Sequence, residues 1–457
     1  MLTTPKVASY MVNRHGVIAE AGVTEIRTRP SPASLHSRTG IRQRAIRGVL
    51  FMLVASLPTI NPTWASTLED GNTAWERRDY TTVLKLYRPL ADKGDAHAQF
   101  SLGLMYYKGQ GVTQDYKQAV RWYRLAADQG VASAEFNLGL AYYYGQGVTQ
   151  DYKQAVKWYQ LAADQGFADA QGNLGNLYYH GQGVTQDYKQ AVKWYQLAAD
   201  QGFADAQFNL GLTYHKGQGV TQDYEEAVKW YRLAAEQGIA SAKLSLGLMY
   251  KSGRGVTQDY REAMKYLQMA AEQGLASAQL NLGVMNHNGH GITQNYPEAM
   301  KWYRLAANQK NVDAQVMLGY MHRFGQGVVQ DYPEAIKWYR LAADQGSALA
   351  QFFLGVMYGD GRGVTQDLKE AIRWYRLAAD QGNALAQSNL GYMYSTDQGV
   401  AQDYSRAHMW YHLASLSGDT NAARNRDIIE VKMTPEQISE AQKMTLACQA
   451  RHLKGCR

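Results

Sequence analysis

The sequence predicts an all-α fold, an array of nine 36-residue helix-turn-helix repeats between capping helices. A block of 36 residues recurs nine times between Asp95 and Gly418 without insertion or deletion. Eight of the nine blocks carry a Gly-x-Gly-Val/Ile loop, and apolar residues recur at helical spacing on both sides of the loop. The loop glycines are Gly109, Gly145, Gly181, Gly217, Gly253, Gly289, Gly325 and Gly361, and Gly399 keeps the register where Asp397 stands in the ninth block. A repeat of this length predicts stacked helical units that cannot bury their apolar faces alone.

The first helix of each unit is predicted from small and apolar residues on one face. In the first block, Ala98, Leu102 and Tyr106 lie four residues apart, with Gly103 beside Leu102. Gly109 then ends the helix, because glycine adopts backbone angles that other residues avoid.

The second helix is predicted to begin at Asp115, whose carboxylate can accept hydrogen bonds from free backbone amides. Gln118 stands three residues later, which predicts a capping box. The apolar stripe of this helix follows at 3.6-residue spacing, and Gly130 is placed for a left-handed C-terminal cap. The stripe comprises Ala119, Trp122, Tyr123, Ala126 and Ala127.

A tryptophan recurs in eight of the second helices. A ladder of this kind could stack bases or capture cations, but an aromatic residue at one helical position in every repeat is usually core. We therefore expect it to fill the space between layers. The ladder is Trp122, Trp158, Trp194, Trp230, Trp302, Trp338, Trp374 and Trp410, with Tyr266 as the substitute.

The complete pattern, from Ala98 through Leu102-Gly103, Gly109-x-Gly111, Asp115 and Trp122-Tyr123 to Gly130, resembles the Sel1-like repeat, a relative of the tetratricopeptide repeat. This resemblance implies a right-handed αα-superhelical solenoid whose concave face is lined by the first helices. It also implies a non-catalytic adaptor role, because such proteins generally scaffold protein complexes. A fold does not identify a partner.

The flanks divide the rest of the chain. Residues 1–40 are expected to be a disordered extension, 41–65 a signal peptide, 66–94 a degenerate half-repeat cap, 95–418 the repeats, and 419–457 a capping helix with its tail. Arginines before the apolar run of residues 48–57, and Ala65 after it, are typical of a secretory signal. We therefore expect a periplasmic or secreted protein. A transit peptide and an organellar location form the alternative, since this segment holds few acidic residues.

Composition restricts the partners. The net charge of +7 arises at the two ends of the chain, while residues 66–418 carry −1. Nucleic acid is therefore not expected as a partner. Cys448 and Cys456 could form a small disulfide loop or remain free thiols. His287 and His290 could hold a metal, but no third ligand lies near them in sequence, so we expect neither a metal nor a cofactor, and interpret these histidines as part of an exposed, diverged loop.

The repeats vary most on their first helices, and this variation selects the candidate partner-binding residues. One position changes from aromatic to cationic along the array, and a second position holds asparagine in most repeats. In related grooves such an asparagine binds ligand backbone, although it can equally bond within its own repeat. The candidates are Tyr143, Tyr179, His215, Lys251, His287 and Arg323, with Asn137, Asn173, Asn209 and Asn281.

We therefore expect a non-enzymatic scaffold that binds a protein or peptide on the concave face. The alternative is a cell-wall-directed protein that binds or processes peptidoglycan or β-lactam-like ligands, as in the cysteine-rich branch of the family. That branch carries a disulfide in each repeat, whereas no repeat here holds cysteine, and the chain lacks the Ser-x-x-Lys motif.

Overall fold

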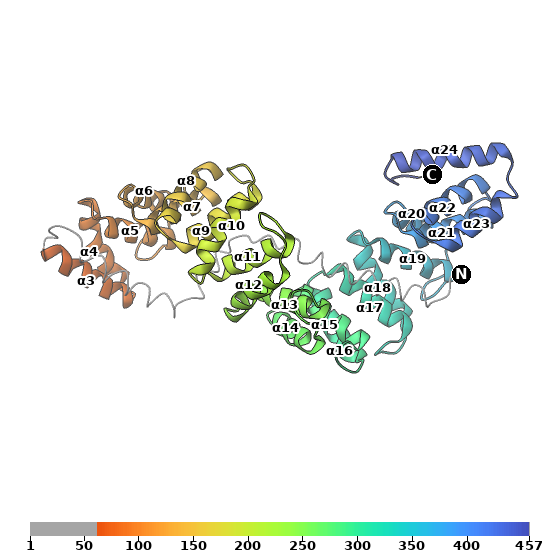
Figure 1. The fold of residues 1–457 in the computed structure, drawn as a ribbon, viewed down its shortest axis with the longest axis horizontal. Coiled ribbons are helices and arrows are strands. Elements are labelled where there is room, and N and C mark those ends of the chain that lie inside the picture. Colours follow the sequence, from red (N-terminus) through yellow and green to blue (C-terminus); the bar gives the residue numbers. More distant parts are fainter. Residues whose placement is uncertain (1–61, 457) are drawn as a thin grey trace. The chain divides into compact units, whose positions relative to one another are not determined.

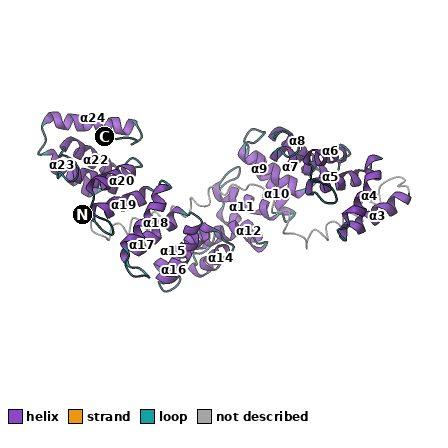
Figure 2. Ribbon diagram, turned by 180° about the vertical axis from the view of Figure 1, so that it is seen from behind, coloured by secondary structure: helices purple, strands orange, loops and turns teal. Residues whose placement is uncertain are grey.

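The computed structural model describes residues 62–456, and this part of the chain folds into 22 helices and no strand (Figure 2). The predicted N-terminal extension and nearly all of the predicted signal peptide lie outside the described residues. Among the helices that are described, none is long and apolar enough to cross a membrane.

The helices alternate as first and second members of the repeats. The first helices are α5 (Ala96–Lys108), α7 (Ala132–Tyr144), α9 (Ala168–His180), α11 (Ala204–Lys216), α13 (Ala240–Ser252), α15 (Ala276–Asn288), α17 (Val312–Phe324), α19 (Ala348–Asp360) and α21 (Ala384–Ser395). The second helices are α6 (Tyr116–Ala127), α8 (Tyr152–Asp164), α10 (Tyr188–Asp200), α12 (Tyr224–Glu236), α14 (Tyr260–Glu272), α16 (Tyr296–Asn308), α18 (Tyr332–Asp344), α20 (Leu368–Ala379) and α22 (Tyr404–Leu416).

The chain separates into two compact units, residues 1–258 and 259–457, which divide between α13 and α14. Within each unit a first helix packs on the second helix of its own repeat, and that second helix packs on the first helix of the next repeat (Figure 1). The predicted all-α solenoid of helix pairs is confirmed.

The ends of the helices confirm most of the predicted starts and stops. The Asp115 carboxylate accepts hydrogen bonds from the amides of Lys117 and Gln118, at 2.9 and 3.1 Å. Gly109 and Gly130 adopt the left-handed φ values of 66° and 79°. The capping box was a wrong prediction, because the Asp115 amide donates to the Tyr106 carbonyl at 3.0 Å. Because the Asp115 amide is already bonded to the first helix, it is not free to donate a hydrogen bond to the Gln118 side chain.

Tyrosine, more than tryptophan, occupies the centre of the helix pairs, in every repeat except the fifth, which has Leu267. Tyr123 is 1% exposed, and a Cβ atom at Gly103 would lie 2.5 Å from its ring. The recurring glycine is therefore required by contact with the tyrosine ring. Trp158 joins adjacent repeats, since it shares a cluster with Ala119 of the preceding second helix and Leu138 of its own first helix. The ladder is less uniformly buried than predicted, because Trp230, Trp338 and Trp374 are half-buried.

A ladder of buried glutamines also joins the repeats, and the sequence analysis did not find it. Gln171 donates to the Ala163 carbonyl at 3.1 Å and accepts from Gln201 Nε2 at 2.8 Å. The same two bonds recur at Gln207, with Ala199 and Gln237. Each of these side chains satisfies a helix end in the previous repeat, so the ladder fixes repeat spacing with neutral hydrogen bonds.

The N-terminal end is covered by α3 (Pro62–Glu76) and α4 (Tyr80–Asp92). Their core contains Tyr87 and Leu90, and continues to Leu102 of α5 and Trp122 of α6. A Cβ atom at Gly71 would lie 2.1 Å from the Tyr87 ring, so α3 and α4 pack as closely as the helices of a repeat.

The C-terminal end is covered by α23 (Thr420–Glu430) and α24 (Pro435–Ala450), and α24 begins with a capping box formed by Thr434 and Gln437. α24 packs on α22, where the Ser405 hydroxyl donates to the Gln437 carbonyl at 3.1 Å. On the same face Leu413 is 3% exposed, whereas its counterpart Leu377 is 41% exposed. This helix therefore removes an apolar edge from water.

The two cysteines join the tail to α24. Cys448 and Cys456 form a disulfide, with Cα atoms 5.2 Å apart. The loop that they close reaches back to the end of α20, where the Gly455 amide donates to the Asp380 carboxylate at 3.2 Å. Of the two alternatives that the sequence left open, the structure has the disulfide.

Candidate functional site

Six of the candidate residues occupy one position in the last turn of successive first helices. Tyr143, Tyr179, His215 and Lys251 lie in the first unit, and His287 and Arg323 lie in the second. We call these six residues the variable strip and describe its two parts separately. The first five are half-buried, while Arg323 is only 8% exposed. The strip therefore presents edges of side chains rather than whole side chains.

Each aromatic ring in the strip contacts the tyrosine ring at the first residue of the second helix in its own repeat. The centroids of Tyr179 and Tyr188 are 5.2 Å apart, and those of His215 and Tyr224 are 5.3 Å apart. The backbone below is fixed by a loop glutamine, as Gln186 Nε2 donates to the Tyr179 carbonyl at 2.9 Å. The repeated loop thus holds one side of each strip residue and leaves its identity free to change.

Strip residues also contact the following repeat. The Tyr179 hydroxyl donates to Gln218 Oε1 at 2.6 Å and accepts from Lys216 Nζ at 3.3 Å. Where the strip residue is the shorter His287, both His287 Nδ1 and Gln326 Oε1 are buried without a hydrogen-bond partner among the described residues. A change from tyrosine to histidine thus breaks a link between repeats.

The four candidate asparagines do not form one uniform row. Asn137 and Asn281 donate to carbonyls one turn earlier in their own helices, Ser133 at 2.6 Å and Ser277 at 2.9 Å. Asn209 and Asn281 are buried, whereas Asn137 and Asn173 are half-buried. Burial raises the pKa of the Tyr159 hydroxyl, and the Asn173 side chain acts on this pKa in the opposite direction. Bonding within the array therefore accounts for much of this position.

A polar network that the sequence analysis missed lies between α9, α10 and α11. Asn176 Oδ1 accepts from the Tyr195 hydroxyl at 2.8 Å and from Asn209 Nδ2 at 3.0 Å. The available sequence signal was Asn176 itself, since most other repeats have leucine or valine there. The network directs Asn209 toward the preceding repeat.

The two histidines considered for a metal are held by tyrosine rings. His287 meets Tyr296 edge-on with centroids 5.2 Å apart, and His290 stacks on Tyr260 at 5.2 Å. Burial lowers the pKa of His287 to about 4, so its ring is neutral at physiological pH. The interpretation as an exposed loop was wrong for His287, which belongs to the last turn of α15 and is half-buried. Within residues 62–456 no three His, Cys, Asp or Glu side chains are placed to hold a metal ion.

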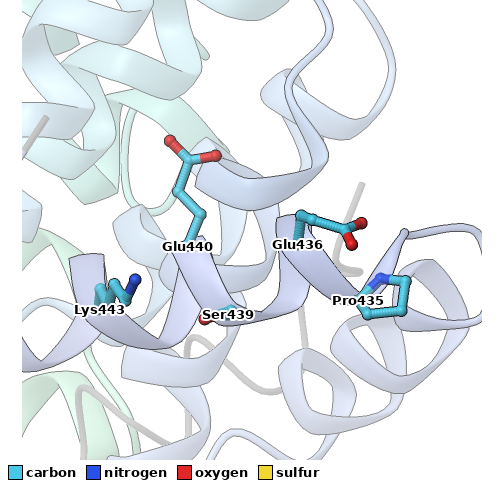
Figure 3. A pocket seen from close by; sticks show the side chains of 5 residues that line it. All are labelled: Pro435, Glu436, Ser439, Glu440 and Lys443. Atoms are coloured by element: carbon cyan, nitrogen blue, oxygen red, sulfur yellow. The ribbon is translucent and has the colours of Figure 1, made fainter.

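A shallow depression of about 430 Å³ lies along α24 and contains no residue of the variable strip (Figure 3). Its lining comes from this single helix and comprises Pro435, Glu436, Ser439, Glu440 and Lys443. All five residues are exposed, and Figure 3 shows the Glu436 and Glu440 carboxylates pointing in different directions. The depression lacks the buried, convergent polar groups that a small-molecule site needs.

Comparison with known proteins agrees with this architecture. The Sel1 repeat model matches nine consecutive segments from residue 96 to residue 419. A protective antigen present in uropathogenic Escherichia coli strains, which displays an SLR fold, is 35% identical, with a TM-score of 0.58, and the match covers 84% of this chain and 91% of the antigen. A Sel1 repeat protein from Oxalobacter formigenes is 36% identical, with a TM-score of 0.55, over 66% of this chain and 89% of its own. No curated protein matches the sequence. The nine matched repeats and the similarity to the antigen establish that the chain belongs to the Sel1 repeat family.

Proposed function

We propose that this protein is a non-catalytic scaffold of the bacterial envelope or the extracellular space, and that it binds a protein or peptide across the ends of its first helices. Sel1 repeat proteins are generally protein-interaction scaffolds. The similar antigen of uropathogenic Escherichia coli gives a precedent for a protein of this fold that immune recognition reaches. The ends of the first helices within each unit form the proposed binding surface.

The distribution of sequence differences carries this proposal. Residues 145–171 and 181–207 are identical and contain a complete second helix each. The variable strip changes over the same repeats, from Tyr143 and Tyr179 to His215. Since the loop and second helix hold the frame unchanged, selection for a partner would act on the strip. Half-buried aromatic edges also suit a protein interface, because they lose little conformational freedom on binding.

The disulfide supports the proposed location. Disulfides persist in oxidising compartments such as the periplasm and the extracellular space. Together with the signal-like segment before Ser66, Cys448–Cys456 favours export over an organellar location. N-terminal sequencing of protein recovered from the periplasm or medium should begin at Ser66. Recovery of the intact chain from the cytosol alone would exclude this location.

Partner capture tests the binding surface. The full exported chain, cross-linked in envelope extract, should retain a defined partner identified by mass spectrometry. Changing Tyr143 and Tyr179 together to alanine should reduce capture at least about tenfold, as expected when interface aromatics are removed. The matched control changes Lys153 and Lys189, which are exposed on the second helices of the same repeats, and should retain capture.

The opposite pattern of capture would move the interface to the second helices. Measurable β-lactam hydrolysis that one point substitution abolishes would favour the cell-wall enzyme instead.

A further inference from the structure

Arg323, at the end of α17, carries a buried charge without a compensating anion. Its side chain is 8% exposed, and no carboxylate of residues 62–456 lies within ion-pair distance of it. Its Nε is buried without a hydrogen-bond partner in the same part of the chain. A buried charge is costly unless it is paired and hydrogen-bonded, so a built-in cation of this kind needs an explanation.

Aromatic rings hold the guanidinium in place but do not neutralise it. Its central carbon lies 5.0 Å from the centroid of Phe324 and 5.3 Å from that of Phe353. Phe353 belongs to the next first helix, α19, and is 1% exposed. Contacts between a cation and these ring faces offset part of the desolvation cost. The arrangement fixes the direction of the guanidinium and leaves its Nε donor without a partner among the described residues.

The carboxylate at the end of the next first helix is already engaged. Asp360 forms an ion pair with Arg362 at 3.3 Å and does not reach Arg323. Burial is the largest cause of the raised pKa of the Tyr375 hydroxyl. Asp360 raises this pKa further, whereas Arg323 lowers it. The Arg323 charge thus acts on the Tyr375 hydroxyl, and also on the Tyr339 hydroxyl of its own repeat, and it forms no ion pair within residues 62–456.

A missing side chain leaves space beside the same hydroxyl. The strip position of the eighth repeat is Gly359, where a Cβ atom would meet only Ala371 Cβ at 3.7 Å and Tyr375 Oη at 3.8 Å. These are ordinary contact distances, so packing does not require glycine there, in contrast to Gly355, whose Cβ would lie 2.5 Å from the Tyr375 ring. The first three repeats carry tyrosine at this position.

We propose that Arg323 and the space at Gly359 form a subsite for one carboxylate of a peptide partner. The guanidinium would donate a charge-assisted hydrogen bond to it, and half-buried Phe324 and Tyr320 would contact an adjacent apolar side chain. A single unpaired cation, with Asp360 already bound to Arg362, matches a monoanion better than a phosphate dianion. This inference rests on the proposed peptide-binding function and names the chemistry of the peptide.

The carboxylate can come from an acidic side chain or from a peptide C-terminus, and three probes distinguish the sources. The first is a fluorescein-labelled peptide with a Leu-Glu-Leu centre and an amidated end. The second replaces Glu with Gln, and the third is the Gln peptide with a free C-terminal carboxylate. Fluorescence anisotropy with the full chain should show one carboxylate peptide binding about tenfold tighter than the neutral peptide, the gain expected from one charge-assisted hydrogen bond.

Two variants remove this preference by different routes. Arg323→Met removes the charge but keeps an apolar side chain of similar length. Gly359→Tyr keeps the charge and fills the space with the residue found in the first three repeats. Each should bring the carboxylate peptides to the affinity of the neutral peptide. The control Arg261→Met removes an exposed arginine of the same unit and should preserve the preference.

Stability measurements separate the subsite from a purely structural arginine. If Arg323 serves a ligand, Arg323→Met should melt at or above the temperature of the unchanged protein, because an unpaired buried charge has been removed. A lower melting temperature, or a carboxylate preference that survives either substitution, would overturn the subsite. Equal binding of all three peptides would also overturn it while leaving the proposed scaffold function intact, since partner capture tests that function separately.

Discussion

First and second helices of the repeats follow different rules, although they alternate in one chain. Every second helix begins with Asp or Asn whose side chain accepts a hydrogen bond from a free amide, as Asp187 does from Lys189 and Gln190. Five first helices begin without such a bond. These five have an apolar residue at that position, namely Val131, Phe167, Phe203, Ile239 and Leu275.

The apolar residues replace capping by packing between repeats. The Phe167 ring lies 5.1 Å from that of Phe136 in the previous first helix. The Phe203 ring fills the space over Gly172, where a Cβ atom would lie 2.8 Å from it. The second helices thus begin with local hydrogen bonds, whereas these five first helices begin with contacts to neighbouring repeats.

The largest effect should come from the tryptophan that joins neighbouring repeats. Trp194, 6% exposed, packs with Ala155 and Leu174, so Trp194→Ala should destabilise the protein by about 3–5 kcal/mol. In a linear array the loss acts through adjacent interfaces, so chemical unfolding followed by circular dichroism should split into separate transitions. Half-buried Trp230 serves as the control, and equal losses at the two sites would contradict this account.

A pair of glycines tests the contact between the two helices of a repeat. Gly139→Ala would place Cβ 2.6 Å from the Tyr159 ring and should cost about 1–3 kcal/mol by overpacking. Gly359→Ala meets no atom closer than 3.7 Å and should not reduce stability. Denaturation midpoints of the two variants should therefore move apart, and a loss at Gly359 would show that this site is packed after all.

Acid should weaken the first-helix end of the sixth repeat. Burial lowers the pKa of His287 to about 4, below an unfolded value near 6.5, so the unfolded chain binds the proton more readily. Its contribution is complete above about pH 6.5 and decreases as pH falls toward 4, with about 1–2 kcal/mol lost by pH 5. His287→Tyr should remove this loss, because tyrosine stays neutral and can bond Gln326 as Tyr179 bonds Gln218.

Urea unfolding of both proteins at pH 7.5 and pH 5 checks this expectation. Other histidines titrate in both chains, so the difference between the two proteins isolates His287. An equal acid effect in the two proteins would mean that His287 does not contribute.

The smallest effect should come from the asparagine position. Asn209→Ala removes its bond to Asn176, which retains the Tyr195 hydroxyl, and should cost about 1 kcal/mol. Asn137→Ala should reduce the free energy of unfolding by less, because the Asn137 side chain only donates an additional hydrogen bond to a carbonyl of its own helix. Thermal melting compares them. If Asn209→Ala leaves stability unchanged and weakens partner capture, Asn209 belongs to the binding surface.

Patterns within one repeat predicted the fold well. Asp115, Gly109 and the stripe around Trp122 are local signals, and they act in the structure as their residue types require. The capping box failed because the Asp115 amide bonds back to Tyr106, a contact made by the folded loop. The glutamine ladder joins residues 30 positions apart, so its partners become clear only when the repeats are stacked.

The candidate site was predicted less completely, because its character depends on neighbouring repeats. Arg323 was expected at the surface with the rest of its position, but Phe353 of the next first helix buries it. Asn209 was expected to face a ligand, yet the exceptional Asn176 of the preceding repeat gives it a partner. In both cases one unusual residue in an adjacent unit changes the environment of a repeated one.

The packing of α24 on α22 limits where further repeats can be added to such a protein. The face of α22 that contacts α24 consists of Ser405, Met409 and Leu413, which are buried. The corresponding residues of the preceding repeat, Lys369, Arg373 and Leu377, are exposed. A copy added after the last repeat would displace the helix that fits only this face. Length can therefore change by gain or loss of 36-residue units in the interior, where the identical segments 145–171 and 181–207 already lie. Proteins that arise in this way would differ in the number of repeats but keep the same capping helices at both ends.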